Sequence, residues 1–242
     1  MPVGESGPVP HAIHLFAHRG GMAHRRENTL EAFTYAQSLG IGGVETDVWL
    51  TRDGVPVLHH DARVRTPHGR RKIAEIARVD LPAHVPSLGD LYDRCGTDMD
   101  VAIDVLDPAA ASAVVTAARS AGGSAVSKLW LCSPLVETLV SWRHLDDAIH
   151  LVHSDNSWNR VHRSDPAAHT RHLRELSIDV LNVQYRSCSR AVVRACHEQQ
   201  IALFVWGVSR ISTMHRLLDL GVDGLMSDHV DRLIGLGSSP TT

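Results

Sequence analysis

The chain has 242 residues, a formal net charge of -3 at neutral pH and a sequence pI near 6.6. This nearly balanced charge gives no global attraction to nucleic acid or to anionic membranes, so we expect neither as a partner. No apolar run reaches the roughly 18 residues of a helical membrane span, so we expect no stable membrane insertion. Hydrophobic residues make up 43% of the chain, enough for a large core.

Cysteine usage and the chain ends indicate the cellular compartment. The cysteines show no C-x-x-C spacing, so we expect buried free thiols at Cys95, Cys132, Cys188 and Cys196. The first dozen residues, MPVGESGPVPHA, have neither the basic region nor the apolar stretch of a signal peptide. We therefore expect a cytoplasmic protein, with a flexible N-terminus over residues 1–12 and a flexible tail over residues 236–242.

In chain order, the first predicted element is a short buried strand over residues 13–17. This apolar run stops at the sequence HRGG, which places His18 at the carboxyl end of the strand. Asn28 and Thr29 can cap a helix that runs to about Leu39, where a glycine follows.

Residues 44–50 form the second predicted strand, which carries two carboxylates. Because side chains alternate along a strand, Glu45 and Asp47 face the same side. Two carboxylates this close repel each other unless a cation lies between them. A solvated edge face is the alternative, but the flanking residues are apolar and β-branched, so we favour a divalent-cation site.

A hairpin is predicted directly after this strand. Residues 53–54 are an Asp-Gly turn signal, and residues 55–58 can return as a short strand that ends beside His60. The polar segment 62–85 follows, with the basic run RRK at residues 70–72. This run is either a positive lip near the mouth of a site or a solvated turn.

The rest of the chain alternates between helical and extended patterns. In order, we predict a helix at 86–95, a strand at 100–106, a helix at 108–121, a strand at 129–132, a helix at 134–145, a strand at 149–152, a helix at 166–176, a strand at 180–184, a helix at 191–199, a strand at 202–208, a helix at 211–220 and a strand at 224–226. This alternation indicates a parallel sheet built from βαβ units. Counting the strands predicts an α/β fold, a (β/α)8 TIM barrel in a single domain over residues 13–235.

Five ordered fragments around the first two strands resemble those of the glycerophosphodiester phosphodiesterase family. They are HRG, ENT followed by AF, E-x-D, a DG turn and HD, all within residues 18–61. Residues 85–88, VPSL, look like the family's I-P-T-L segment, and GVDGLMSD near the C-terminus looks like its G-V-D-G-I-x-T-D. The resemblance covers nearly the whole chain.

The resemblance implies metal-dependent hydrolysis of a small-molecule glycerophosphodiester to glycerol 3-phosphate and an alcohol. It implies that Glu45, Asp47 and a carboxylate on the third strand, here Asp104, bind one divalent cation, Mg2+ or Ca2+. His18 and His60 would then be the general acid and base, because imidazole titrates near neutral pH. The sequence leaves open which histidine is the acid, and it leaves the oligomeric state open.

Three further residues receive roles from the same resemblance. We expect Arg19 to hold a phosphate oxygen, a task that suits a guanidinium group. Trp206 is expected to form a wall of the substrate pocket, and Glu27 to support the residues that touch the substrate. The chain has 17 histidines, and most of them are expected at structural or surface positions.

Two segments depart from the family pattern. The family has I-E-I-K on the third strand, whereas this chain has IDVL, so Asp104 is one methylene shorter and Leu106 replaces a lysine. The family's W-T-V-N segment is WGVS at residues 206–209. We expect that phosphodiester hydrolysis survives with a lower rate or a changed preference, for example for a more apolar alcohol group.

Two alternative functions stay open. A non-catalytic barrel could bind a phosphorylated ligand, but such a protein would not need an acid–base pair. A lysophospholipase D-like phosphodiesterase would share the catalytic residues but would need an apolar groove or a membrane-facing patch. Exposed Trp49 and Trp158 at the barrel mouth would favour that second alternative.

Overall fold

The computed structural model describes residues 13–155 and 165–238. The flexible N-terminus predicted at residues 1–12, residues 239–242 of the predicted tail and Trp158 lie outside the described residues, whereas residues 236–238 of that tail belong to the 3-10 helix Gly235–Ser238. No helix within the described ranges has the length and apolar character needed to cross a membrane.

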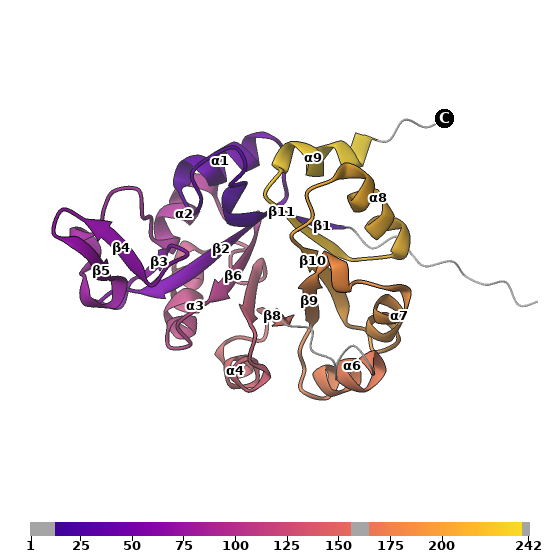
Figure 1. Cartoon of the computed structure of the whole chain (residues 1–242). Helices are drawn as coiled ribbons and strands as arrows, with labels where there is room; N and C mark the ends of the chain where they lie inside the picture. The colour runs from indigo at the N-terminus through magenta and orange to yellow at the C-terminus, as the bar shows by residue number, and fades with distance from the viewer. Residues whose placement is uncertain (1–12, 156–164, 239–242) are drawn as a thin grey trace, which may run out of the picture.

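A closed barrel of parallel strands forms the centre of the molecule (Figure 1). In chain order the barrel strands are β1 (His14–Ala17), β2 (Gly43–Leu50), β6 (Asp100–Val105), β7 (Leu129–Ser133), β8 (His150–Asp155), β9 (Val180–Gln184), β10 (Ala202–Trp206) and β11 (Gly224–Ser227). Each strand pairs with the next, and β1 pairs with both β2 and β11, which closes the sheet. The predicted (β/α)8 barrel is therefore confirmed.

The helices surround the barrel on its outer side (Figure 1). They are α1 (Leu30–Ser38), α2 (Leu88–Cys95), α3 (Ala110–Ala121), α4 (Val136–Trp142), α6 (Pro166–Glu175), α7 (Arg190–Glu198), α8 (Ile211–Leu220) and α9 (Val230–Ile234). Short 3-10 helices are found at His18–Gly20, Ile73–Glu75, Arg78–Asp80, Arg143–Leu145, Tyr185–Ser187 and Gly235–Ser238. Helices α1, α2, α6 and α7 begin with a side-chain cap; at α1, the Thr29 side chain accepts a hydrogen bond from the Ala32 amide.

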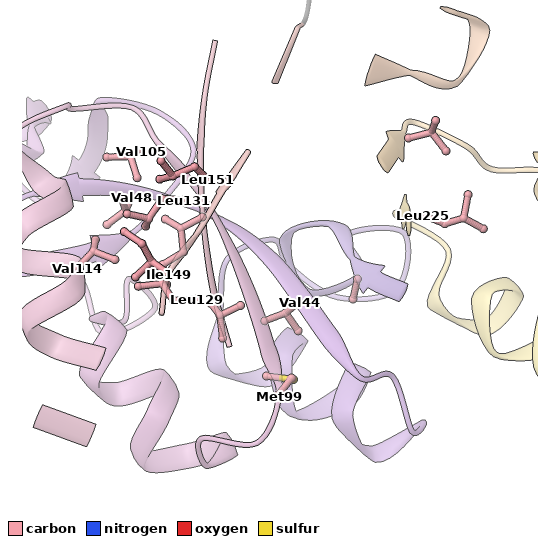
Figure 2. Close-up of a cluster of buried hydrophobic side chains, with 14 of the residues drawn as sticks. Val44, Val48, Met99, Val105, Val114, Leu129, Leu131, Ile149, Leu151 and Leu225 are labelled. Carbon is pink, nitrogen blue, oxygen red and sulfur yellow. The ribbon is translucent and has the colours of Figure 1, made fainter. Parts of the chain in front are cut away.

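The main core lies between the strands and the surrounding helices. Figure 2 shows Val114 of α3 facing the outward side chains of Val48 on β2 and Leu131 on β7. A smaller cluster fills the inside of the barrel around Phe16 and Phe204. These two rings fit because their neighbours are glycines: a Cβ atom on Gly224 would lie 2.5 Å from Phe204 Cδ1.

The predicted hairpin after β2 is present. Strand β3 (Pro56–Leu58) runs antiparallel to β2, with Val48 opposite Leu58. A second hairpin of β4 (Arg63–Thr66) and β5 (Gly69–Lys72) was not expected, and it projects to one side of the barrel (Figure 1). It is anchored by Val64, which is buried in a small cluster with residues that include Ile73.

Candidate active site

Three carboxylates point into the barrel from two adjacent strands. Glu45 and Asp47 lie on β2 and Asp104 lies on β6, and the parallel register places Asp47 opposite Asp104. One carboxylate oxygen from each residue lies within 4.8 Å of the others. Glu45 and Asp47 therefore face the same side of β2, as predicted, and the neighbouring strand β6 brings Asp104 to the same point.

Burial makes this cluster electrostatically unfavourable without a cation. Glu45 and Asp47 are only 4% and 3% exposed. Burial raises the pKa of Glu45 well above its usual value, and the charges of Asp47 and Asp104 raise it further. Burial and the charge of Asp47 raise the pKa of Asp104 in the same way. A hard divalent cation would remove this cost, because carboxylate oxygens are the ligands that it prefers.

His18 lies where β1 ends, beside this cluster. Its Nδ1 atom is 2.5 Å from Asp228 Oδ1, and its Nε2 atom is 3.7 Å from Glu45 Oε2. Burial alone would lower the pKa of His18, but the charge of Glu45 and the hydrogen bond with Asp228 outweigh it and raise the pKa to about 9. Asp228 thus fixes the ring orientation from one side and leaves Nε2 facing the carboxylates.

Arg19 connects the carboxylates with Glu27. Its backbone N–H donates to Glu45 Oε2 at 2.9 Å, and its guanidinium donates to Glu27 Oε2 at 2.7 Å. The guanidinium Nε lies 3.4 Å from Asp47 Oδ2. Arg19 has a positive φ of 49°, and the next residue, Gly20, has a φ of 81°. A side chain at Gly20 would strike Ala32, since its Cβ atom would lie 2.7 Å from Ala32 Cβ, which explains the sequence HRG.

Asn28 has a role that the sequence did not reveal. Its amide donates to Asp47 Oδ2 at 2.9 Å and its carbonyl oxygen accepts from the Thr46 hydroxyl at 2.8 Å. It adopts a φ of 53°, a conformation that asparagine tolerates better than most residues. Thr29 alone caps α1, so Asn28 serves to orient Asp47.

His60 lies on the outer side of the site, after β3. Its Nδ1 atom is 3.1 Å from Asp61 Oδ1, and Asp61 in turn contacts Arg70 of the β4–β5 hairpin at 3.2 Å. The Trp49 indole donates to the backbone oxygen of His60. Arg70 of the basic run at residues 70–72 thus pairs with the neighbour of His60, but it is exposed and does not line the cavity, so the positive lip and the solvated turn both stay open.

One cavity brings together the seven residues predicted for catalysis, metal binding and substrate binding. It has a volume of about 270 Å³ and opens at the carboxyl ends of the strands. Its lining includes His18, Arg19, Glu45, Asp47, His60, Asp104 and Trp206, together with Leu106, Cys132, Ser154, Asn182 and Met226. Carboxyl strand ends are where barrel enzymes place their active sites.

The Glycerophosphoryl diester phosphodiesterase family matches this chain over residues 18–232. The chain belongs to this family. The match confirms the family indicated by the sequence motifs and, with it, the enzyme class of phosphoric diester hydrolases.

Individual relatives and solved structures agree with this assignment. A glycerophosphodiester phosphodiesterase from Caldanaerobacter subterraneus is 26% identical, over 92% of this chain and 96% of that one. A glycerophosphodiester phosphodiesterase structure from Thermotoga maritima has a TM-score of 0.79 at 22% identity, covering 94% of this chain and 100% of that one. An Oleispira antarctica phosphodiesterase in complex with the product sn-glycerol-3-phosphate has a TM-score of 0.80 at 21% identity, covering 93% and 97%. These structures share the fold of this family member.

All four cysteines are buried and free. Asp228 is a second site residue whose role the sequence did not reveal, although the motif GVDGLMSD ends in it.

Proposed function

We propose that the protein hydrolyses glycerophosphodiesters to glycerol 3-phosphate and an alcohol. The observation that carries this proposal is the single cavity in which three carboxylates and two histidines converge at the carboxyl ends of the strands. Membership of the family supports the substrate class. The glycerol 3-phosphate product bound by the Oleispira antarctica phosphodiesterase supports it as well.

The donor set fits one divalent cation, Mg2+ or Ca2+. Glu45, Asp47 and Asp104 would hold it, because they offer three hard oxygen ligands at one point in a buried site. Burial and the neighbouring carboxylates raise the pKa of Glu45 and of Asp104 in spite of the nearby His18 and Arg19, which supports a bound cation at this point. When bound, the cation would neutralise charge on the phosphodiester.

His18 and His60 would carry out the two proton transfers. One accepts the proton of the attacking hydroxyl or water as the new phosphorus–oxygen bond forms, and the other donates a proton to the alkoxide that leaves. Such catalysis contributes about 10²–10⁴-fold in rate. The contact of His18 Nδ1 with Asp228 supports this role, because it holds the ring with Nε2 toward the carboxylates.

Arg19 and Trp206 would bind the substrate. Arg19 is held in place by Glu27 at 2.7 Å, which orients its guanidinium toward the cavity for a phosphate oxygen. The buried indole N–H of Trp206 has no acceptor within the described part of the chain. A substrate oxygen can therefore accept this hydrogen bond while the ring forms a wall of the cavity.

Trp158, one of the two tryptophans that would favour the lysophospholipase D alternative, lies outside the described residues, and the other, Trp49, does not favour it. Trp49 is partly buried against the β3–β5 region and donates to the His60 carbonyl, so it does not form an exposed apolar anchor. Leu106 is 39% exposed and lines the cavity, and Leu135 and Ile211 are further exposed apolar side chains in segments that follow β7 and β10.

The test is release of glycerol 3-phosphate from a panel of glycerophosphodiesters, with Mg2+, Ca2+ or a chelator. We expect turnover that requires a metal and is lost in His18→Ala. A matched control is His172→Ala, because His172 is an exposed histidine of α6 outside the cavity. A folded protein without turnover on any diester and metal would overturn the proposal.

A further inference from the structure

We propose that a cationic pocket beside the active-site mouth binds a phosphomonoester carried by the alcohol part of the substrate. This inference rests on the proposed function, because it names a substrate class for the same site. The pocket has a volume of about 280 Å³ and is lined by Tyr185, Arg186, Ser209, Arg210 and Thr213. We call it the arginine pocket.

The lining of the arginine pocket suits an anion. All five lining residues carry a hydrogen-bond donor on the side chain, and none is a carboxylate. Arg186 and Arg210 are exposed, and neither forms an ion pair within residues 13–155 and 165–238. Arg232 adds a third positive charge, since its guanidinium donates to the Ser209 carbonyl oxygen. A guanidinium group can donate two parallel hydrogen bonds to a phosphate, so two arginines in one pocket suit a phosphate dianion.

One of the two arginines is already held in place. The guanidinium carbon of Arg186 lies 5.3 Å from the centre of the Tyr185 ring, a cation–π contact. Tyr185 in turn begins the 3-10 helix that follows β9. A positioned guanidinium loses less freedom on binding than a mobile one, so its contribution to affinity is larger.

The arginine pocket adjoins the cavity of the active site. Tyr185 and Arg186 follow β9, and Ser209 and Arg210 follow β10, so the pocket lies at the same carboxyl ends of the strands. Trp206 ends β10 and lines the active-site cavity. The next residue, Gly207, packs beside Tyr185, because a Cβ atom there would lie 3.9 Å from Tyr185 Cδ1. The arginine pocket therefore lies next to the part of the active-site cavity that Trp206 lines.

The order of the strands places the carboxylate cluster and the arginine pocket on opposite sides of the barrel mouth. Asp104 lies on β6, and the arginine pocket lies beside β10. In the closed sheet, β7, β8 and β9 separate β6 from β10 on one side, and β2, β1 and β11 separate them on the other. We infer from this placement that a diester held at the carboxylate cluster directs one alcohol across the mouth toward Arg186 and Arg210.

The experiment compares two substrates that differ by one phosphomonoester, glycerophosphoinositol 4-phosphate and glycerophosphoinositol. The protein is assayed as the wild type, as Arg186→Gln with Arg210→Gln, and as Arg171→Gln with Arg174→Gln. The last pair removes the same charge from the exposed side of α6 and is the matched control. Release of glycerol 3-phosphate with the activating metal gives kcat and KM for each substrate.

We expect the wild type to prefer the phosphorylated substrate by about tenfold in kcat/KM, mainly through KM. The preference should fall as salt is raised, because exposed charges are screened. It should drop to about one in the Arg186 and Arg210 variant and persist in the control. Equal kcat/KM for both substrates, or an undiminished preference in the Arg186 and Arg210 variant, would overturn the arginine pocket while leaving the proposed function intact. No turnover of either substrate would overturn the proposed function, and the arginine pocket with it.

Discussion

Replacement of Asp228 by asparagine tests how His18 is held. The wild-type contact joins His18 Nδ1 to Asp228 Oδ1 at 2.5 Å, and the charge of Asp228 helps to raise the pKa of His18. Asparagine keeps the shape but removes the charge. Hydrogen bonds to charged groups are worth about 1.5–3 kcal/mol, which corresponds to a loss of roughly 10- to 100-fold in kcat/KM if the contact persists in the transition state.

The assay is steady-state release of glycerol 3-phosphate by Asp228→Asn, His18→Ala and the double variant. Because Asp228 acts through His18, the double variant should be no slower than His18→Ala. Asp231→Asn is the matched control: Asp231 contacts His24 at 2.7 Å in a similar pair, but neither residue lines the cavity. Full activity of Asp228→Asn, or independent losses that multiply in the double variant, would refute the reasoning.

Three other substitutions test the surroundings of the site and one supporting contact. Asn28→Ala removes the amide that donates to Asp47 at 2.9 Å, so we expect metal affinity to fall about tenfold by calorimetric titration, and unchanged affinity would contradict this. Leu106→Lys restores the cation found in the family pattern, and we expect higher activity or a changed order of substrates; no change in either would refute the idea. For Asp100, burial opposes ionisation, but the contacts with His14 at 3.1 Å and Lys128 at 3.3 Å lower its pKa. Its stabilisation is therefore present above the unfolded-state pKa of about 4 and is lost as the pH falls through the folded-state pKa. Asp100→Asn should lower the free energy of unfolding in urea by about 1 kcal/mol at pH 7, because solvent screens part of the interaction of Asp100 with His14 and Lys128. The loss should be smaller at pH 3, and an equal loss at both pH values would contradict this.

The spacing of apolar residues along the sequence correctly predicted the helices and strands in which that spacing is regular. The predicted helix over residues 211–220 coincides with α8, and the two-residue period on β2 correctly placed Glu45 and Asp47 on one face. The β4–β5 hairpin was missed because Val64 is the one buried residue among its ten residues, 63–72, so no alternating apolar pattern marks its strands. The short helix α9 was missed as well.

The missed site residues depend on contacts that no local pattern contains. Asp228 is 210 positions from His18, and the two meet only because β11 pairs with β1 when the barrel closes. Asparagine is a common helix N-cap residue, so the sequence indicated a cap at Asn28 and not its hydrogen bond to Asp47 on β2. The order of the strands could be predicted from the fold, whereas the partners of individual side chains required coordinates.

The most direct measurement is the titration of metal-free protein with Mg2+ and with Ca2+ while glycerol 3-phosphate release and ion binding are followed together. We predict that activity appears as one ion binds per chain, and that Asp47→Asn loses both, since Asp47 lies within the carboxylate cluster. Full activity in excess chelator, or unchanged activity of folded Asp47→Asn, would contradict a mechanism built on these carboxylates.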